Sequence, residues 1–242
     1  MKKIKQLQIA FQLPIYHRQI PQWRGAIIEW AGLEKDRFHN HKTGQERYYR
    51  YPLIQYFVWN RQAAILALNE GAHQLEDLLA QKEWRIRWRD QTHLLQTDQV
   101  QLDWPSVGLT EQMHTYQLQH WLPFNQQNYQ WWSNEARDLK ARATKLEKIL
   151  LAHLLTFATG IRWQIPGQLI VRLQHIQRTK RLRFHQTPMV AFDICFECNL
   201  RLPEGIRLGR VVSHGFGELK WRSSPPKDKL QQDRNIKPIR AF

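Results

Sequence analysis

Apolar residues follow two spacings along the first half of the chain, and the order of these spacings predicts a fold. Period-two alternation or a short apolar run is typical of strands, and a spacing of three to four residues is typical of helices. The first half therefore gives strands at residues 7–13, 51–59, 63–67 and 84–89, and helices at 16–30 and from 70 onward. Asn60-Arg61-Gln62, between two of the strands, predicts a hairpin. The resulting order, β-α-β-β-α-β, is the ferredoxin-like arrangement that RNA-recognition modules also use.

The second half repeats part of this order. The predicted elements are a polar connector at about 92–108, strands at 113–118, 169–173 and 190–198, and a basic turn at 178–181. An apolar stripe from Trp132 to Phe157 predicts one long helix, and Thr159-Gly160 is its expected end. His153 lies in that stripe, and we interpret it as a hydrogen-bonded core histidine. A second ferredoxin-like unit follows, although the pattern of its second helix is weak.

We therefore expect an α+β protein built from two tandem ferredoxin-like (RNA-recognition-module-like) domains. The N-terminal domain is expected to cover residues 1–100, and the C-terminal domain residues 111–221. Residues 222–242 are basic and polar, and they are expected to form a flexible tail.

The net charge of the chain indicates the kind of partner that it binds. Lys and Arg number 36 against 21 Asp and Glu, so the net charge is +15 over 242 residues. Such an excess is unfavourable for a compact fold unless a polyanion is bound, and nucleic acid fits because neutralised phosphates release counterions. The alternative is a merely soluble basic protein. No run of about 18 apolar residues occurs, so no transmembrane helix and no membrane partner are expected.

The two cysteines, Cys195 and Cys198, lie in an apolar run that predicts a strand. Residues three apart on a strand point to opposite faces, which suits neither a disulfide nor a shared metal. We expect two core cysteines in a reducing cytoplasm.

The first candidate site is Phe38-His39-Asn40-His41-Lys42. Imidazoles titrate near neutral pH, so one histidine can act as base and the other as acid. RNA carries its own nucleophile, the 2′-hydroxyl, and Lys42 can stabilise charge on the phosphate, so no metal or other cofactor is needed. The pair can also be half of a metal site, a polar turn or a phosphate contact, and spacing alone favours the turn.

Two further segments suggest RNA binding. Glycines can take positive φ and turn backbone N–H groups toward an anion, and an aromatic ring can stack on a base. The candidate loop residues are Gly209, Ser213, His214, Gly215, Phe216 and Gly217. Basic hairpins can contact the backbone of an A-form stem. The candidate hairpin residues are Arg172, Arg178, Lys180, Arg181 and Arg183. A tight hairpin and ordinary surface charge are the respective alternatives.

Three motifs together carry a family resemblance: Phe38-His39-Asn40-His41, Tyr51-Pro52-Leu53-Ile54-Gln55-Tyr56, and Gly209 with Ser213-His214-Gly215-Phe216-Gly217. They resemble the CRISPR-associated repeat-processing endoribonucleases, in particular the paired-histidine subfamily, over roughly residues 1–220. The resemblance implies two ferredoxin-like domains and metal-independent cutting within the repeats of a precursor RNA. The implied products are a 2′,3′-cyclic phosphate (or 3′-phosphate) and a 5′-hydroxyl. His39 and His41 match the catalytic histidines of that subfamily, and Gly209 to Gly217 match its RNA-contacting loop.

The expected partners are CRISPR repeat RNA and other subunits of a CRISPR effector complex. Two rival interpretations remain open. The chain can be a catalytically inactive tandem RNA-binding protein that holds a repeat hairpin within such a complex. It can also be a metal-dependent nuclease, which the lack of an Asp/Glu cluster in the sequence disfavours.

Overall fold

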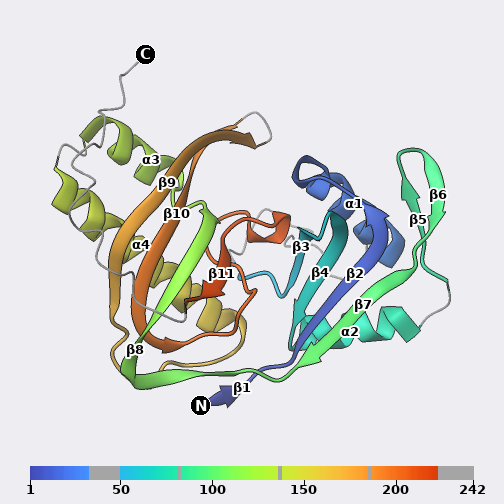
Figure 1. The fold of residues 1–242 in the computed structure, drawn as a ribbon, viewed down its shortest axis with the longest axis horizontal. Helices are drawn as coiled ribbons and strands as arrows, with labels where there is room; N and C mark the ends of the chain where they lie inside the picture. The colour runs from blue at the N-terminus through green and yellow to red at the C-terminus, as the bar shows by residue number, and fades with distance from the viewer. Residues whose placement is uncertain (33–49, 81–82, 136–137, 185–186, 223–242) are drawn as a thin grey trace.

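The computed structural model describes residues 1–32, 50–80, 83–135, 138–184 and 187–222. They form two lobes, each a β-sheet with helices on its outer side, and the two sheets face each other across the middle of the molecule (Figure 1). Both sheets have the antiparallel order of a ferredoxin-like unit. The expectation of an α+β protein with two tandem ferredoxin-like domains is confirmed.

The N-terminal lobe follows the predicted order with one insertion. Its elements are β2 (Gln6–Pro14), η1 (His17–Gln19), α1 (Ile20–Ala31), β3 (Ile54–Trp59), β4 (Gln62–Leu68), α2 (Glu70–Ala80), β5 (Arg85–Trp88), β6 (Gln91–Leu94) and β7 (Thr97–Asp103). The sheet order is β3-β4-β2-β7. Asn60 and Arg61 take φ of 49° and 65°, as the two central residues of a tight hairpin do, so the predicted hairpin is confirmed.

The prediction for the fourth strand of this sheet was wrong. The alternating segment 84–89 does not join the sheet but forms β5, which pairs with β6 in a separate hairpin. Its tryptophans face the core instead, where Trp84 stacks on Trp30 at a centroid distance of 4.2 Å. The fourth strand is β7, inside the predicted connector. Val100 and Leu102 alternate with polar residues at period two, but every residue of β7 is exposed, and the surrounding polar, Gln-rich composition favoured a connector.

The C-terminal lobe begins directly after β7. Its elements are β8 (Ser106–Trp121), α3 (Gln126–Gln130), η2 (Trp131–Glu135), α4 (Leu139–Gly160), β9 (Val171–Phe184), β10 (Thr187–Arg201), η3 (Val212–His214) and β11 (Glu218–Trp221). The strand order is β9-β10-β8-β11, and β1 (Lys2–Lys3) pairs with the start of β8. Between β10 and β11 the described residues contain one short 3-10 turn, η3, where the weak second helix was expected.

The predicted long helix is divided. Trp132 lies in η2, a π-helical turn, and α4 begins only at Leu139. Asp138 caps α4, because its carboxylate accepts hydrogen bonds from the backbone N–H groups of Lys140 and Ala141. Leu139 is 63% exposed, so it does not belong to the buried stripe. The predicted end of the helix at Gly160 is confirmed.

The prediction of a basic turn at 178–181 was also wrong. These residues lie within β9, where Arg178 pairs with Asp193 and Arg181 pairs with Val190 of β10. Exposed basic side chains do not end a strand when the backbone of a neighbouring strand still offers a complete ladder. The candidate basic residues therefore lie along a strand, which makes their spacing more regular than that of a turn.

One hydrophobic core runs through both lobes. Ala10, Phe57 and Leu66 of the N-terminal sheet belong to the same buried cluster as the residues between β8, β10 and α4. Tyr51 packs edge-on against Phe157 of α4, with ring centroids 5.2 Å apart. A second cluster fills the space between the N-terminal sheet and its helices α1 and α2. The lobes are therefore joined by apolar packing.

The two cysteines are buried and free, as expected of core cysteines. Cys198 belongs to the shared core, whereas Cys195 lies on the opposite face of β10, where the Arg222 guanidinium contacts its sulfur. No helix in the described segments is both long and apolar enough to span a membrane.

His153 of α4 is hydrogen-bonded, as predicted, but its side chain is half-buried at the border of the core. Its Nδ1 accepts a hydrogen bond from Trp121 Nε1 at 3.2 Å, so the neutral imidazole is the form that fits. Burial, and secondarily the charge of Arg210, lowers the pKa of His153 from its ordinary 6.5 to about 4. Between pH 6.5 and pH 4 this imidazole is protonated in the unfolded chain but not in the folded one. Its contribution to the free energy of unfolding is therefore complete above pH 6.5 and is lost as the pH falls toward 4.

We expect this one group to reduce the free energy of unfolding by about 3 kcal/mol between pH 6.5 and pH 4. Urea unfolding at a series of pH values measures it. His153→Gln, which keeps an acceptor for Trp121 but does not titrate, is the control. The difference in unfolding free energy between wild type and variant should fall with pH in that range. Parallel curves for the two proteins would contradict the assignment.

Candidate nucleic-acid interface

The predicted basic residues lie on β9, which forms an edge of its sheet. Arg172, Arg178, Lys180, Arg181 and Arg183 are all exposed. Because side chains alternate along a strand, Arg178 and Lys180 project from one face of β9, and Arg181 and Arg183 from the other. None of these four forms an ion pair with a carboxylate of the described residues. A polyanion can therefore reach positive charge on both faces of the strand.

The Gly-rich loop has the backbone conformation that its glycines predict. Gly209, Gly215 and Gly217 have φ of 113°, 84° and 77°, values that residues with a Cβ rarely adopt. A Cβ on Gly217 would clash with the carbonyl oxygen of Leu208. That oxygen is close because Leu208 and Gly217 face each other across the base of the loop, where Leu208 N–H donates to Gly217 O at 2.8 Å. The loop is thus a tight, closed structure.

Phe184 brings the end of β9 and the Gly-rich loop together. Its ring lies edge-on to that of His214 at 4.9 Å and to that of Phe216 at 6.0 Å. The Ser213 hydroxyl and His214 Nδ1 lie 3.2 Å apart, within hydrogen-bond distance. The two groups of predicted RNA-binding residues are therefore neighbours in space, although the sequence offered no reason to join them.

The loop also packs on the N-terminal lobe. A Cβ on Gly215 would lie 3.0 Å from the Ile20 side chain at the start of α1 and 3.2 Å from the Tyr56 carbonyl of β3. Only a residue without a side chain allows this approach. The loop therefore sits where the two lobes meet.

A cluster of charged groups at this junction was not predicted. His17, just before α1, is exposed, and burial of part of its ring lowers its pKa. The charges of His120, Arg207 and Lys180 lower it further, and Glu218 opposes them. These residues come from both lobes, and more than a hundred positions separate His17 from His120. No sequence spacing could have linked them. The cluster thus places a partly buried imidazole of one lobe beside charged side chains of the other.

His39, His41 and Lys42 lie outside the described residues, as do Arg47 and the rest of 33–49. The described chain stops at Gly32, directly after α1, and resumes at Arg50, before β3. The assignment of catalysis to this pair therefore remains a prediction.

The motif Tyr51-Pro52-Leu53-Ile54-Gln55-Tyr56 has a structural role in the described chain. Gln55 is fully buried, and its Nε2 donates to the Tyr51 hydroxyl at 2.8 Å and to the Pro52 carbonyl at 3.1 Å. Burial raises the pKa of Tyr51, so its hydroxyl stays protonated. The motif fixes the segment that follows residues 33–49 against α4.

Comparison with protein families gives two matches that together cover most of the chain. The model described as the Cas6b N-terminal domain matches residues 2–104, and the model described as the Cas6b C-terminal domain matches residues 108–221. No curated protein matches the chain.

Several solved structures share this fold. One, described as the crystal structure of Cas6b, is 23% identical, covers 91% of this chain and 100% of its own, and has a TM-score of 0.79. A second, described as the CRISPR RNA processing endoribonuclease Cas6b, is 21% identical with the same coverage and a TM-score of 0.68. A third, Csf5, described as a CRISPR-Cas type IV Cas6 crRNA endonuclease, is 13% identical with the same coverage and a TM-score of 0.54. At these identities the likeness concerns the fold.

Proposed function

The chain belongs to the Cas6b family, and from this premise we propose that it is an endoribonuclease that processes CRISPR RNA by cutting within the repeats. The observation that carries the proposal is the match of both family domains over residues 2–104 and 108–221. One of the solved Cas6b structures is itself described as a CRISPR RNA processing endoribonuclease. The basic strand β9 beside the Gly-rich loop supplies a surface that suits RNA.

The proposed chemistry is a metal-independent transesterification. One histidine of the pair His39 and His41 takes the proton of the 2′-hydroxyl, and the 2′-oxygen attacks the adjacent phosphorus. The bond from phosphorus to the 5′-oxygen breaks, and the other histidine gives a proton to that oxygen. Lys42 stabilises the extra negative charge on the phosphate. The products are a 2′,3′-cyclic phosphate and a 5′-hydroxyl.

We further propose that β9 and the Gly-rich loop hold the RNA backbone. Arg172, Arg178, Lys180, Arg181 and Arg183 would contact phosphates, since a guanidinium group can bind two phosphate oxygens at once and the Lys180 ammonium attracts them as a point charge. The loop from Gly209 to Gly217 would offer backbone N–H groups, with Ser213, His214 and Phe216 beside them. The partner is CRISPR repeat RNA, and other effector subunits are further candidates. The domain limits 1–100 and 111–221, with a tail at 222–242, also remain proposals.

The proposal is tested by incubating the purified protein with repeat RNA in EDTA. We expect full cleavage, because neither the nucleophile nor the acid and base depends on a metal ion. Once the cut position is mapped, an RNA with deoxyribose at that position should bind but remain intact, since its nucleophile is missing. Cleavage that EDTA abolishes would disprove the metal-independent chemistry. Repeat RNA that is bound tightly but never cut would support the inactive RNA-binding protein instead.

A further inference from the structure

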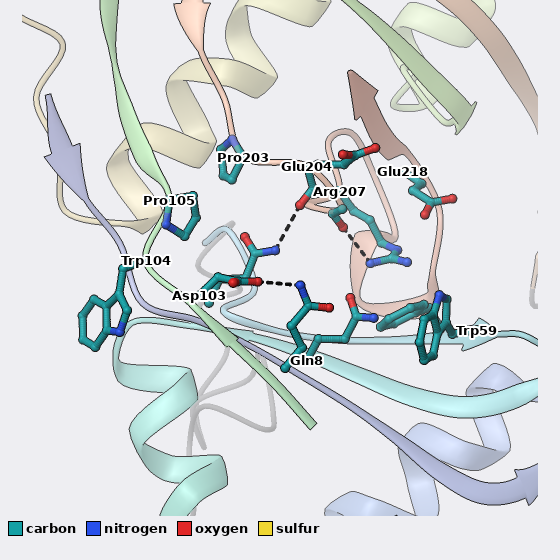
Figure 2. A pocket seen from close by; sticks show the side chains of 13 residues that line it. Gln8, Trp59, Asp103, Trp104, Pro105, Pro203, Glu204, Arg207 and Glu218 are labelled. Carbon is teal, nitrogen blue, oxygen red and sulfur yellow. Dashed lines mark hydrogen bonds between the residues drawn. The ribbon is translucent and has the colours of Figure 1, made fainter. Parts of the chain in front are cut away.

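A polar pocket of about 640 Å³ lies between the two lobes (Figure 2). One wall is the face of the N-terminal sheet that is turned away from α1 and α2, where Gln8 of β2 lies beside Gln101 of β7. The other wall is the segment of the C-terminal lobe around Arg207. The volume is within the ~300–1,000 Å³ of small-molecule sites.

The polar wall results from the alternation of β2 and β7. Leu7 and Ile9 of β2 face the helices, so Gln6 and Gln8, which alternate with them, face the other lobe. On β7, Gln101 Nε2 donates to Asp103 Oδ2 at 2.7 Å, and Asp103 Oδ1 has no hydrogen-bond partner among the described residues. The wall therefore offers amide groups and a carboxylate acceptor.

Arg207 on the opposite wall is the unusual member of the lining. It is only 2% exposed, and its guanidinium lies 4.0 Å from the centroid of the Phe57 ring. Its Nη1 donates to Gly205 O at 3.0 Å, but its Nε has no hydrogen-bond partner among the described residues. Burial lowers the pKa of Arg207 to about 10, although Glu218 opposes the shift. A buried cation is unfavourable, and because Nε itself is buried, a ligand in the pocket could accept a hydrogen bond from Nη2, for which the described residues offer no acceptor.

The charges of the pocket select the class of ligand. Asp103, Glu204 and Glu218 all line it, so a phosphate would face three carboxylates and is disfavoured. A flat, uncharged ring that accepts hydrogen bonds on one edge and donates them on another fits better. Figure 2 shows Asp103 and Arg207 on different sides of the pocket, with Trp59 beside the guanidinium.

We propose that this pocket holds one unpaired guanine of the RNA, a role that rests on the RNA processing proposed above. O6 and N7 of guanine accept hydrogen bonds, which suits a guanidinium, and its N1–H and N2–H₂ groups donate, which suits a carboxylate. Trp59 offers a ring for stacking. Adenine would place its N1 acceptor against Asp103 and its N6 donor against Arg207, and both contacts would be repulsive.

The test uses the full chain and fluorescein-labelled pentamers, UUGUU and UUAUU, in an anisotropy titration. We expect UUGUU to bind about tenfold more tightly than UUAUU, and Asp103→Asn to remove this preference. Asp77→Asn is the matched control, because Asp77 is exposed on α2, which packs on the other face of the sheet. Trp59→Leu keeps an apolar side chain and should weaken both pentamers alike. Equal affinities for the two pentamers in the wild type would overturn the proposal.

A crosslink locates the base independently of any variant. A pentamer with 6-thioguanosine at its centre should crosslink under ultraviolet light to peptides that contain Trp59 or Asp103, as mass spectrometry would show. Crosslinks confined to other parts of the chain would overturn the proposal. Repeat cleavage is measured in parallel on the same protein. Cleavage without a guanine preference refutes the pocket alone, and a guanine preference without cleavage refutes the proposed endonuclease alone.

Discussion

Replacing either His39 or His41 with alanine should slow repeat cleavage by about 10²- to 10⁴-fold, while the affinity for the repeat changes by no more than about twofold. The reason is that a general acid or base transfers a proton in the transition state and contributes little to binding the RNA. Single-turnover cleavage with enzyme in excess measures the rate, and binding of the deoxy-substituted repeat measures the affinity. The double variant should be only slightly slower than the slower single variant, because residues that act as a unit are not additive.

His93→Ala is the matched control for this experiment. His93 lies on β6, in the hairpin that extends from the N-terminal lobe away from β9 and the Gly-rich loop (Figure 1). The His93 variant should cleave at the wild-type rate. Full activity in both His39→Ala and His41→Ala would remove the pair from the mechanism. The charged group around His17 would then be the next place to look, since its imidazole lies at the junction that holds the loop.

Gly217→Ala should destabilise the fold by more than ~4 kcal/mol, and little soluble protein is expected. The added Cβ would clash with the Leu208 carbonyl oxygen, a backbone atom that cannot rotate away. The φ of 77° adds strain for any residue with a Cβ. Thermal and urea unfolding of whatever soluble protein is recovered measures the loss.

Gly25→Ala provides the opposite outcome in the same assay. Gly25 lies in the middle of α1, it is exposed, and nothing lies within 4 Å of the position of its Cβ. Alanine in an open helix position should raise the unfolding free energy by about 0.5–1 kcal/mol. A Gly217 variant as stable as the Gly25 variant would show that the loop base is not as tightly closed as described.

The sequence predicted those elements whose signal is local. The stripe around Trp23 and Ile27 gave α1, and Asn60-Arg61 gave the hairpin, because apolar spacing and turn chemistry act between neighbours. Strand β7 was missed although Val100 and Leu102 alternate with polar residues, because its polar, Gln-rich composition favoured a connector. Its place in the sheet comes from backbone pairing with β2, and its polar side chains serve a pocket wall instead of a core.

The interface was predictable in part for the same reason. The glycines of the loop predicted its positive φ values, and the basic residues of β9 predicted its charge. The prediction of a turn at 178–181 was wrong, because these residues lie within β9. The pocket around Arg207 and the charged group around His17 could not be predicted from the sequence, because each is assembled from residues of both lobes. The pair His39 and His41 is the reverse case, since it is conspicuous in the sequence and lies outside the described residues.

The apolar core that runs through both lobes has a consequence for how RNA is read. Phe57 and Leu66 of the N-terminal lobe belong to the same buried cluster as the apolar residues inside the C-terminal lobe. The lobes therefore cannot move apart without exposing that core to water. The distance from the guanine pocket to the Gly-rich loop is therefore fixed by packing. If both proposals hold, the two binding sites keep a constant separation, and the flexible RNA must change its conformation to contact both of them.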